Sequence, residues 1–301
     1  MQGAAVTFAD GSSTLMHPIV PQPLQMLIER LTSKVVRVQT VNKLFGESRQ
    51  PCFKLVLENG AILKARLLDE AFEVQRVASL LPYLPPTHFP QLCDWRGRAV
   101  LEPWIDGKLL VSQDQADSVH QQAGKILAEV HQAKLPDPLP AMPRSVDSWL
   151  RHFLQEVEQL CQADMLSQSE AQLLGQVVLQ ARPAEIEICL VHRDFCAENL
   201  VDQDGCLVSI DNMSITVGSP CEDLARTFYR WHMSAIQKQQ FLIGYGSLRD
   251  PQHFLRHETF WSCLVLVHAI YYQSDWGSGK TMETLERLKC WLNNETSPSI
   301  S

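Results

Sequence analysis

Residues near the middle of the chain have the types and spacing that phosphoryl transfer requires. This chemistry needs a carboxylate that orients the attacking hydroxyl, and oxygen ligands for a divalent cation that holds the nucleotide phosphates. The segment HRDFCAENL (192–200) supplies Asp194 and Asn199, and Asp211 follows in the segment SIDN. Asp194 comes directly after an expected strand, on a loop where a carboxylate can face a cleft. The oxygens of Asn199 and Asp211 suit a hard cation such as Mg²⁺.

An expected hairpin positions these groups. The segments NLV and CLVSI are predicted strands on either side of Asp204-Gly205, a dipeptide typical of tight turns. Pairing across that turn would bring Asp211 near Asn199. A single loop aspartate is more often a turn former than a catalytic group. The whole pattern of His-x-Asp-x4-Asn, an aliphatic hairpin and Ile-Asp is a much more specific, kinase-like signal.

The periodicity changes along the chain. The first third predicts a small mixed sheet, with a hairpin at Glu58-Asn59-Gly60 and a helix that ends at Pro82. After a linker near 105–110, helical periodicity dominates. We therefore expect an α+β chain with a β-rich N-terminal lobe over 1–104 and a larger, mainly helical C-terminal lobe over 105–301.

Composition argues against several classes of protein. The formal net charge is −8 and the basic residues form no run, so a nucleic-acid partner is not expected. The nine cysteines are scattered without a C-x-x-C pair, which favours a reducing cytoplasm over a disulfide framework. The sequence shows no export signal and no apolar run long enough to cross a bilayer, so no membrane association is expected. These features favour no particular oligomeric state.

The segment LVHRDFCAENLVDQDGCLVSIDNMSITVGSPCEDLAR resembles the core of the aminoglycoside phosphotransferase and choline kinase family of small-molecule kinases. Three further segments resemble family segments in the expected order: LEPWIDGKLL (101–110), GKILAEVHQ (124–132) and FLIGYG (241–246). The resemblance extends over roughly residues 35–250. It implies a bilobal protein-kinase-like fold, and transfer of the γ-phosphoryl group of ATP, with Mg²⁺, to a hydroxyl of a small molecule.

The resemblance also implies roles for residues of the central segment. Asp194 would be the catalytic base or hydroxyl-orienting carboxylate, and Asn199 and Asp211 would bind magnesium. His192 would brace the loop. Asp223 would support the loop by receiving hydrogen bonds from its backbone.

Further positions match the nucleotide site of the family. Lys64 matches the lysine that contacts the α- and β-phosphates. Glu73 is its best-matching ion-pair partner, with Glu70 as the competitor. Glu102 and Trp104 occupy the hinge that reads adenine through backbone groups. The residue between them is proline, which has no N–H, so the donor is expected from Trp104 or a neighbour.

Two alternatives remain open. Arg193 gives the HRD triplet of protein kinases, but position 196 is Cys where those enzymes have lysine, and Asp223 follows Asp211 by only twelve positions. That spacing leaves no room for a usual activation segment and disfavours a protein kinase. A catalytically silent, kinase-like nucleotide-binding module is the other alternative.

The expected phosphate-covering loop, KLFGESRQP, has the single glycine Gly46 rather than a glycine-rich pattern.

The acceptor is less well specified. Residues 232–301 contain six acidic and six basic residues, whereas a polycationic aminoglycoside would favour an acidic pocket. A sugar, amino sugar, amino alcohol or related metabolite fits this balance at least as well, and an aminoglycoside stays in the set of expected acceptors. His253 and His257, with Glu258 and His268, could in principle bind a metal, but ordinary helical placement is favoured.

Overall fold

The computed structural model describes residues 6–7, 13–14, 20–41, 51–110, 116–139, 145–274 and 280–296. The loop around Gly46 lies outside the described residues. The chain divides into two compact units, residues 1–110 with 199–216, and residues 111–198 with 217–301. The hairpin that contains Asp211 therefore groups with the first unit, although the HRD triplet that precedes it belongs to the second.

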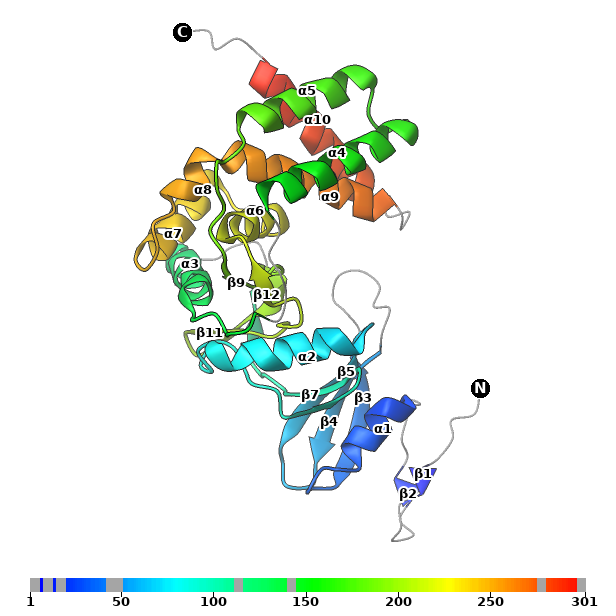
Figure 1. Cartoon of the computed structure of the whole chain (residues 1–301). Helices are drawn as coiled ribbons and strands as arrows, with labels where there is room; N and C mark the ends of the chain where they lie inside the picture. The colour runs from blue at the N-terminus through cyan, green and yellow to red at the C-terminus, as the bar shows by residue number, and fades with distance from the viewer. Residues whose placement is uncertain are drawn as a thin grey trace. The chain divides into compact units, whose positions relative to one another are not determined.

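An antiparallel five-stranded sheet forms the centre of the first unit (Figure 1). In spatial order its strands are β3 (Val35–Val41), β4 (Cys52–Leu57), β5 (Ile62–Leu67), β7 (Ala99–Pro103) and β6 (Asp94–Arg96). Burial alternates along β4 and β5, as period-2 side-chain direction requires. The buried face packs with α1 (Gln22–Ile28) in one apolar cluster, and α2 (Ala71–Leu80) packs against β7.

A smaller sheet in the first unit contains the predicted central hairpin. It consists of β8 (Lys108–Leu109), β10 (Leu200–Gln203) and β11 (Cys206–Ser209). The hairpin is confirmed, because Gln203 pairs with Cys206 across a turn in which Asp204 has φ 54° and Gly205 φ 89°. Positive φ at both central residues is the requirement of the tight hairpin turn that Asp-Gly favours. Short elements elsewhere in this unit are β1 (Val6–Thr7), β2 (Ser13–Thr14) and η1 (Leu81–Tyr83).

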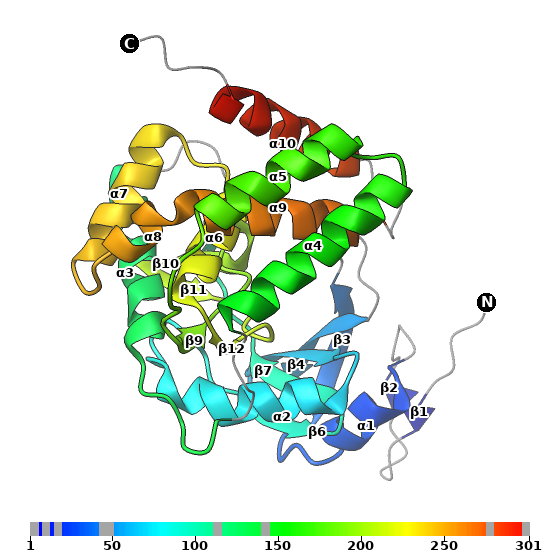
Figure 2. The same ribbon diagram turned by 45° about the horizontal axis from the view of Figure 1, so that its top comes forward.

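The second unit is mainly helical. Its elements are α3 (Asp117–Gln132), α4 (Val146–Gln162), α5 (Gln168–Gln180), β9 (Cys189–Val191), η2 (Ala197–Asn199), β12 (Thr216–Gly218), α6 (Pro220–Arg230), α7 (Ala235–Gly246), α8 (Gln252–Arg256), α9 (Glu258–Ser274) and α10 (Lys280–Thr296). Helix α9 contacts α4, α5, α6 and α10, which surround it in Figure 2. Strands β9 and β12 pair beside this helical group.

The predicted α+β fold class is confirmed, because an N-terminal antiparallel sheet is followed by a mainly helical region. Helices α6 and α7 are separate, because the chain is extended at Trp231 and Ser234 caps a new helix. Among the described residues, no helix has the length and apolar content needed to cross a bilayer.

Candidate active site

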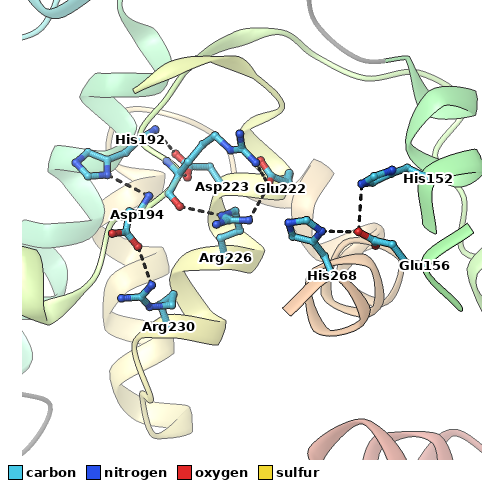
Figure 3. A network of polar contacts seen from close by, with 10 residues as sticks. His152, Glu156, His192, Asp194, Glu222, Asp223, Arg226, Arg230 and His268 are labelled. Carbon is cyan, nitrogen blue, oxygen red and sulfur yellow. Dashed lines mark hydrogen bonds and ion pairs between the residues drawn. The ribbon is translucent and has the colours of Figure 1, made fainter. Parts of the chain in front are cut away.

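The loop that follows β9 is fixed by one buried carboxylate (Figure 3). Asp223 lies in the first turn of α6 and receives the backbone N–H groups of His192 and Arg193, each at 2.6 Å. The local sequence explains the position of this aspartate. Ser219 caps α6 by accepting the N–H of Cys221, and a proline occupies the first helical position. Asp223 is fully buried, so these N–H groups replace the water that the carboxylate loses.

Two aromatic side chains complete the environment of Asp223. His131 places Nε2 3.1 Å from Asp223 Oδ2, and its Nδ1 lies 2.8 Å from the Tyr245 hydroxyl. A neutral ring with its proton on Nε2 satisfies both contacts. Burial lowers the pKa of His131 and favours this neutral form. Burial alone would raise the pKa of Asp223, but the hydrogen bonds from His131 and the loop backbone outweigh it and hold that pKa below its usual value.

Asp194 lies on the loop that Asp223 holds. Its backbone N–H donates to His192 Nδ1 at 3.3 Å, and its side chain keeps a quarter of its surface exposed. Arg230, in the last turn of α6, places Nη1 3.0 Å from Asp194 and Nη2 3.3 Å from Glu198. Burial would lower the pKa of Arg230, but the Asp194 carboxylate and its neighbours raise it.

The sequence patterns did not single out Arg230. Its Nη2 lies 3.9 Å from the Cys196 sulfur, so a guanidinium stands beside the position where protein kinases have lysine. The available signal was the spacing on α6, because Arg230 follows Asp223 by seven residues, which is two helical turns. Arg226, between them, donates Nε to the Arg193 carbonyl at 2.8 Å and adds a second tie to the loop.

In the first unit, an arginine lies between two acidic side chains. Arg66 Nη1 is 2.9 Å from Asp211 Oδ1, and Arg66 Nε is 2.8 Å from Glu102 Oε2. Burial would lower the pKa of Arg66, but Asp211 and Glu102 outweigh it and raise the pKa. Arg66 was not among the predicted site residues, although it shares the polar face of β5 with Lys64.

Lys64 has described contacts that differ from the predicted ion pair. Its Nζ donates to the Ile210 carbonyl at 2.8 Å and lies 3.8 Å from Glu102. Glu73 accepts the backbone N–H of Glu70 at 3.2 Å, and the two residues form a capping box at the start of α2. The carboxylate expected to pair with Lys64 is thus engaged at its own helix N-terminus, and Glu102 stands beside Lys64.

The hairpin carries the predicted metal ligands. The last residue pair of the β10–β11 hairpin is Leu200 with Ser209. One residue further, Ile210 donates its N–H to the Asn199 carbonyl at 2.9 Å, so Asn199 lies opposite the residue that precedes Asp211. An amide oxygen and a carboxylate on adjacent strand ends form a donor set that suits Mg²⁺, which prefers oxygen ligands and takes few from the protein. The two residues therefore fit the implied ion.

The hinge backbone continues the pairing of the five-stranded sheet. The backbone N–H of Trp104, expected as an adenine donor, donates to the Ile62 carbonyl at 3.0 Å, because the β5–β7 pairing continues one residue past Pro103. Because this N–H is used within the sheet, a neighbouring residue is the favoured one of the two predicted adenine donors. The Trp104 indole donates to Asp106 at 2.9 Å, and Lys54 Nζ lies 4.1 Å from its ring centre.

A profile of the family described as "Phosphotransferase enzyme family" matches residues 42–256. No curated protein gives a significant match. Three solved structures are similar. A macrolide 2'-phosphotransferase from Brachybacterium faecium has a TM-score of 0.64 and 14% identity, over 89% of this chain and 98% of that one. A choline kinase from Cryptosporidium parvum has a TM-score of 0.64 and 12% identity, over 86% and 88%. A spectinomycin phosphotransferase in complex with ADP and spectinomycin has a TM-score of 0.60 and 14% identity, over 88% and 93%.

Proposed function

This chain belongs to the phosphotransferase enzyme family, and on that premise we propose that it is a kinase that transfers the γ-phosphoryl group of ATP to a hydroxyl of a small molecule. The observation that best supports this is the way Asp223 holds the loop. Two backbone N–H groups bound to one buried carboxylate fix the loop, while the Asp194 carboxylate remains a quarter exposed. A fixed carboxylate open to solvent can orient an acceptor hydroxyl.

We assign the proton transfer to Asp194. Its carboxylate accepts a hydrogen bond from the acceptor hydroxyl and takes the proton as the hydroxyl oxygen bonds to the γ-phosphorus. The bond from that phosphorus to the β,γ-bridging oxygen breaks, and ADP leaves. Arg230 pairs with Asp194 in this structure, and its guanidinium has the charge and the fork of donors that suit an oxygen of the transferring phosphoryl group.

The nucleotide side is assigned to the first unit. Asn199 and Asp211 would hold Mg²⁺, which supplies positive charge at the phosphate oxygens when bound. Lys64 is the proposed contact to the α- and β-phosphates, and Arg66 orients Asp211 through its ion pair. The hinge at Glu102–Asp106 is the proposed adenine-binding segment. The predicted pairing of Lys64 with Glu73, or with its competitor Glu70, stays a prediction, and both glutamates lie in the capping box of α2 in this structure.

The acceptor is proposed as a sugar, amino sugar, amino alcohol or related metabolite, with an aminoglycoside as a further member of the test set. The equal numbers of acidic and basic residues over 232–301 favour an acceptor of low net charge. The names of similar structures include a macrolide, choline and spectinomycin enzyme, so acceptors of all three kinds belong in the screen.

ADP release in the presence of Mg-ATP and an acceptor panel tests the proposal. We expect turnover with at least one small-molecule hydroxyl. Asp194→Asn should lower kcat about 10²–10⁴-fold while nucleotide affinity is retained, because the lost group acts on the acceptor. Asp204→Asn is the matched control. It makes the same chemical change in the hairpin turn, where asparagine tolerates the positive φ.

Full activity of Asp194→Asn would contradict the assigned role. The two alternative functions have their own signatures in the same assays. Labelled phosphate on a peptide mixture, but on no metabolite, would indicate a protein kinase. Magnesium-dependent nucleotide binding by calorimetry, without turnover on any acceptor, would indicate a silent nucleotide-binding module.

A further inference from the structure

A second group of ionisable side chains lies between two helices of the second unit, apart from the residues assigned to phosphoryl transfer (Figure 3). His152 and Glu156 are four residues apart on α4, and His268 projects from α9. His152 Nε2 lies 3.1 Å from Glu156 Oε1, and His268 Nδ1 lies 2.5 Å from the same oxygen. One carboxylate oxygen is thus shared by two imidazoles.

We propose that His152, Glu156 and His268 form a binding site for Zn²⁺ or a similar divalent transition metal, which links α4 to α9. Two histidines and one glutamate are a recognised ligand set for zinc, and they leave a fourth position for water or another ligand. Hard, oxygen-preferring ions such as Mg²⁺ do not suit two imidazoles, whereas zinc does. This ligand set differs in chemistry from the oxygen donors Asn199 and Asp211.

The distances fit such an ion. The three ligand atoms all lie within 4.8 Å of one another. Zinc bonds to histidine nitrogen and carboxylate oxygen are about 2.0–2.2 Å long, so two ligands at the tetrahedral angle are about 3.3 Å apart. Small side-chain rotations bring the ligand atoms to that separation. Coordination through these nitrogens leaves the other ring nitrogen of each imidazole to carry the proton.

The three ligand side chains differ in their exposure to solvent. The Glu156 side chain is 4% exposed, whereas those of His152 and His268 are 38% and 37% exposed. A buried carboxylate without a full counter-charge is unfavourable, and a bound cation would supply that charge. The half-exposed imidazoles leave a path for an ion to enter from solvent. Their rings are also close, with centroids 6.0 Å apart.

The sequence alone offers a different set, His253 and His257 at a four-residue spacing with Glu258 and His268 as further ligands, and favours ordinary helical placement for it. The structure instead places His268 beside His152 and Glu156 of α4, a proximity that only the packing of α4 against α9 creates. The His253–His257 pair therefore serves as a control.

Zinc titration of the untagged full-length chain tests this site. The protein is first stripped with a chelator and then titrated with Zn²⁺ by calorimetry, without nucleotide. We expect one equivalent to bind and to raise the melting temperature. His152→Gln, His268→Gln and Glu156→Gln should each weaken that binding at least about tenfold, whereas His257→Gln should not. Glutamine keeps a polar group of similar size, which protects the fold.

Cobalt provides a second readout that hydrogen bonding alone cannot produce. Co²⁺ in the wild-type chain should show the intense visible bands of a four-coordinate site, and His152→Gln should remove them. Equal zinc stoichiometry and affinity in the wild type and all three variants would overturn the proposal, as would the absence of cobalt bands in the wild type. Neither result depends on kinase activity, so the two proposals fail separately.

Discussion

Replacing Asp223 by asparagine would measure how strongly one carboxylate holds the loop that carries Asp194. Three donors converge on Asp223: the backbone N–H groups of His192 and Arg193 at 2.6 Å each, and His131 Nε2 at 3.1 Å. Asparagine retains one acceptor oxygen and turns an NH₂ group toward the other donors. Breaking a buried charged contact in this way costs about 3–5 kcal/mol.

Urea unfolding at pH 7 would measure this loss. We expect Asp223→Asn to lower the free energy of unfolding by about 3–5 kcal/mol and to reduce turnover, because Asp194 is no longer held. The control is Asp164→Asn, an exposed residue with φ 56° where asparagine is tolerated, and it should change stability by less than about 0.5 kcal/mol. A loss below about 1 kcal/mol for Asp223→Asn would refute the reasoning, since the three donors would then have other partners.

The pH dependence provides an independent check on the same variant. The pKa of Asp223 is lowered in the folded chain, so its carboxylate stabilises the fold above the unfolded value near 3.8. That contribution is lost as pH falls from this value toward the lower folded pKa. The difference in stability between the wild type and Asp223→Asn should therefore shrink below about pH 4 and be steady above about pH 5.

Three further predictions use other parts of the molecule. Gly124→Ala should destabilise the chain by about 1–3 kcal/mol or more, because its Cβ would lie 2.0 Å from the Phe241 carbonyl oxygen. Gly175→Ala, whose Cβ meets its nearest atom at 3.9 Å, should instead stabilise by about 0.5–1 kcal/mol in the same thermal melt. Lys64→Met should weaken calorimetric ATP affinity about tenfold or more with little loss of stability, whereas Arg66→Met should lower stability by about 3–5 kcal/mol because it removes the ion pairs that Arg66 makes with Asp211 and Glu102. The pKa of His131 is lowered in the folded chain, so on acidification the unfolded chain binds this proton at a higher pH than the folded chain does. The melting temperature of the wild type should therefore fall as pH drops through 6.5, and His131→Gln should show a smaller fall over the same pH range.

The sequence contained enough local information to predict the fold class and the central hairpin. Alternating burial along β5 and the Asp204-Gly205 turn follow from period-2 patterning and from turn chemistry, which act over a few residues. The cap of α6 has the same local character, since Ser219 and Pro220 act on the adjacent backbone. Three residues after Ser219, the carboxylate of Glu222 lies 3.6 Å from Arg226.

Contacts between distant segments were not predictable in this way. Arg66 and Asp211 are far apart in sequence, and nothing local indicates that an arginine on the polar face of β5 should meet the residue after β11. The contact between Glu102 and Lys64 was likewise not predictable from local sequence. Its position next to Lys64 follows from the β5–β7 register, which pairs these two residues directly, whereas the sequence offered Glu73 by its place on a helix. Register between non-adjacent strands depends on the assembled sheet.

The position of the loop that carries Asp194 depends on two glycines in other helices. Helices α3 and α7 cross so closely that a Cβ on Gly124 or Gly244 would lie about 2 Å from backbone oxygen of the other helix. His131 follows Gly124 by two turns of α3, and Tyr245 is adjacent to Gly244 on α7. The crossing therefore sets the 2.8 Å contact between the His131 ring and the Tyr245 hydroxyl, which orients the ring toward Asp223. Since Asp223 holds the loop backbone, a change at either glycine should reach Asp194 through this series of contacts, and stability and turnover should fall together.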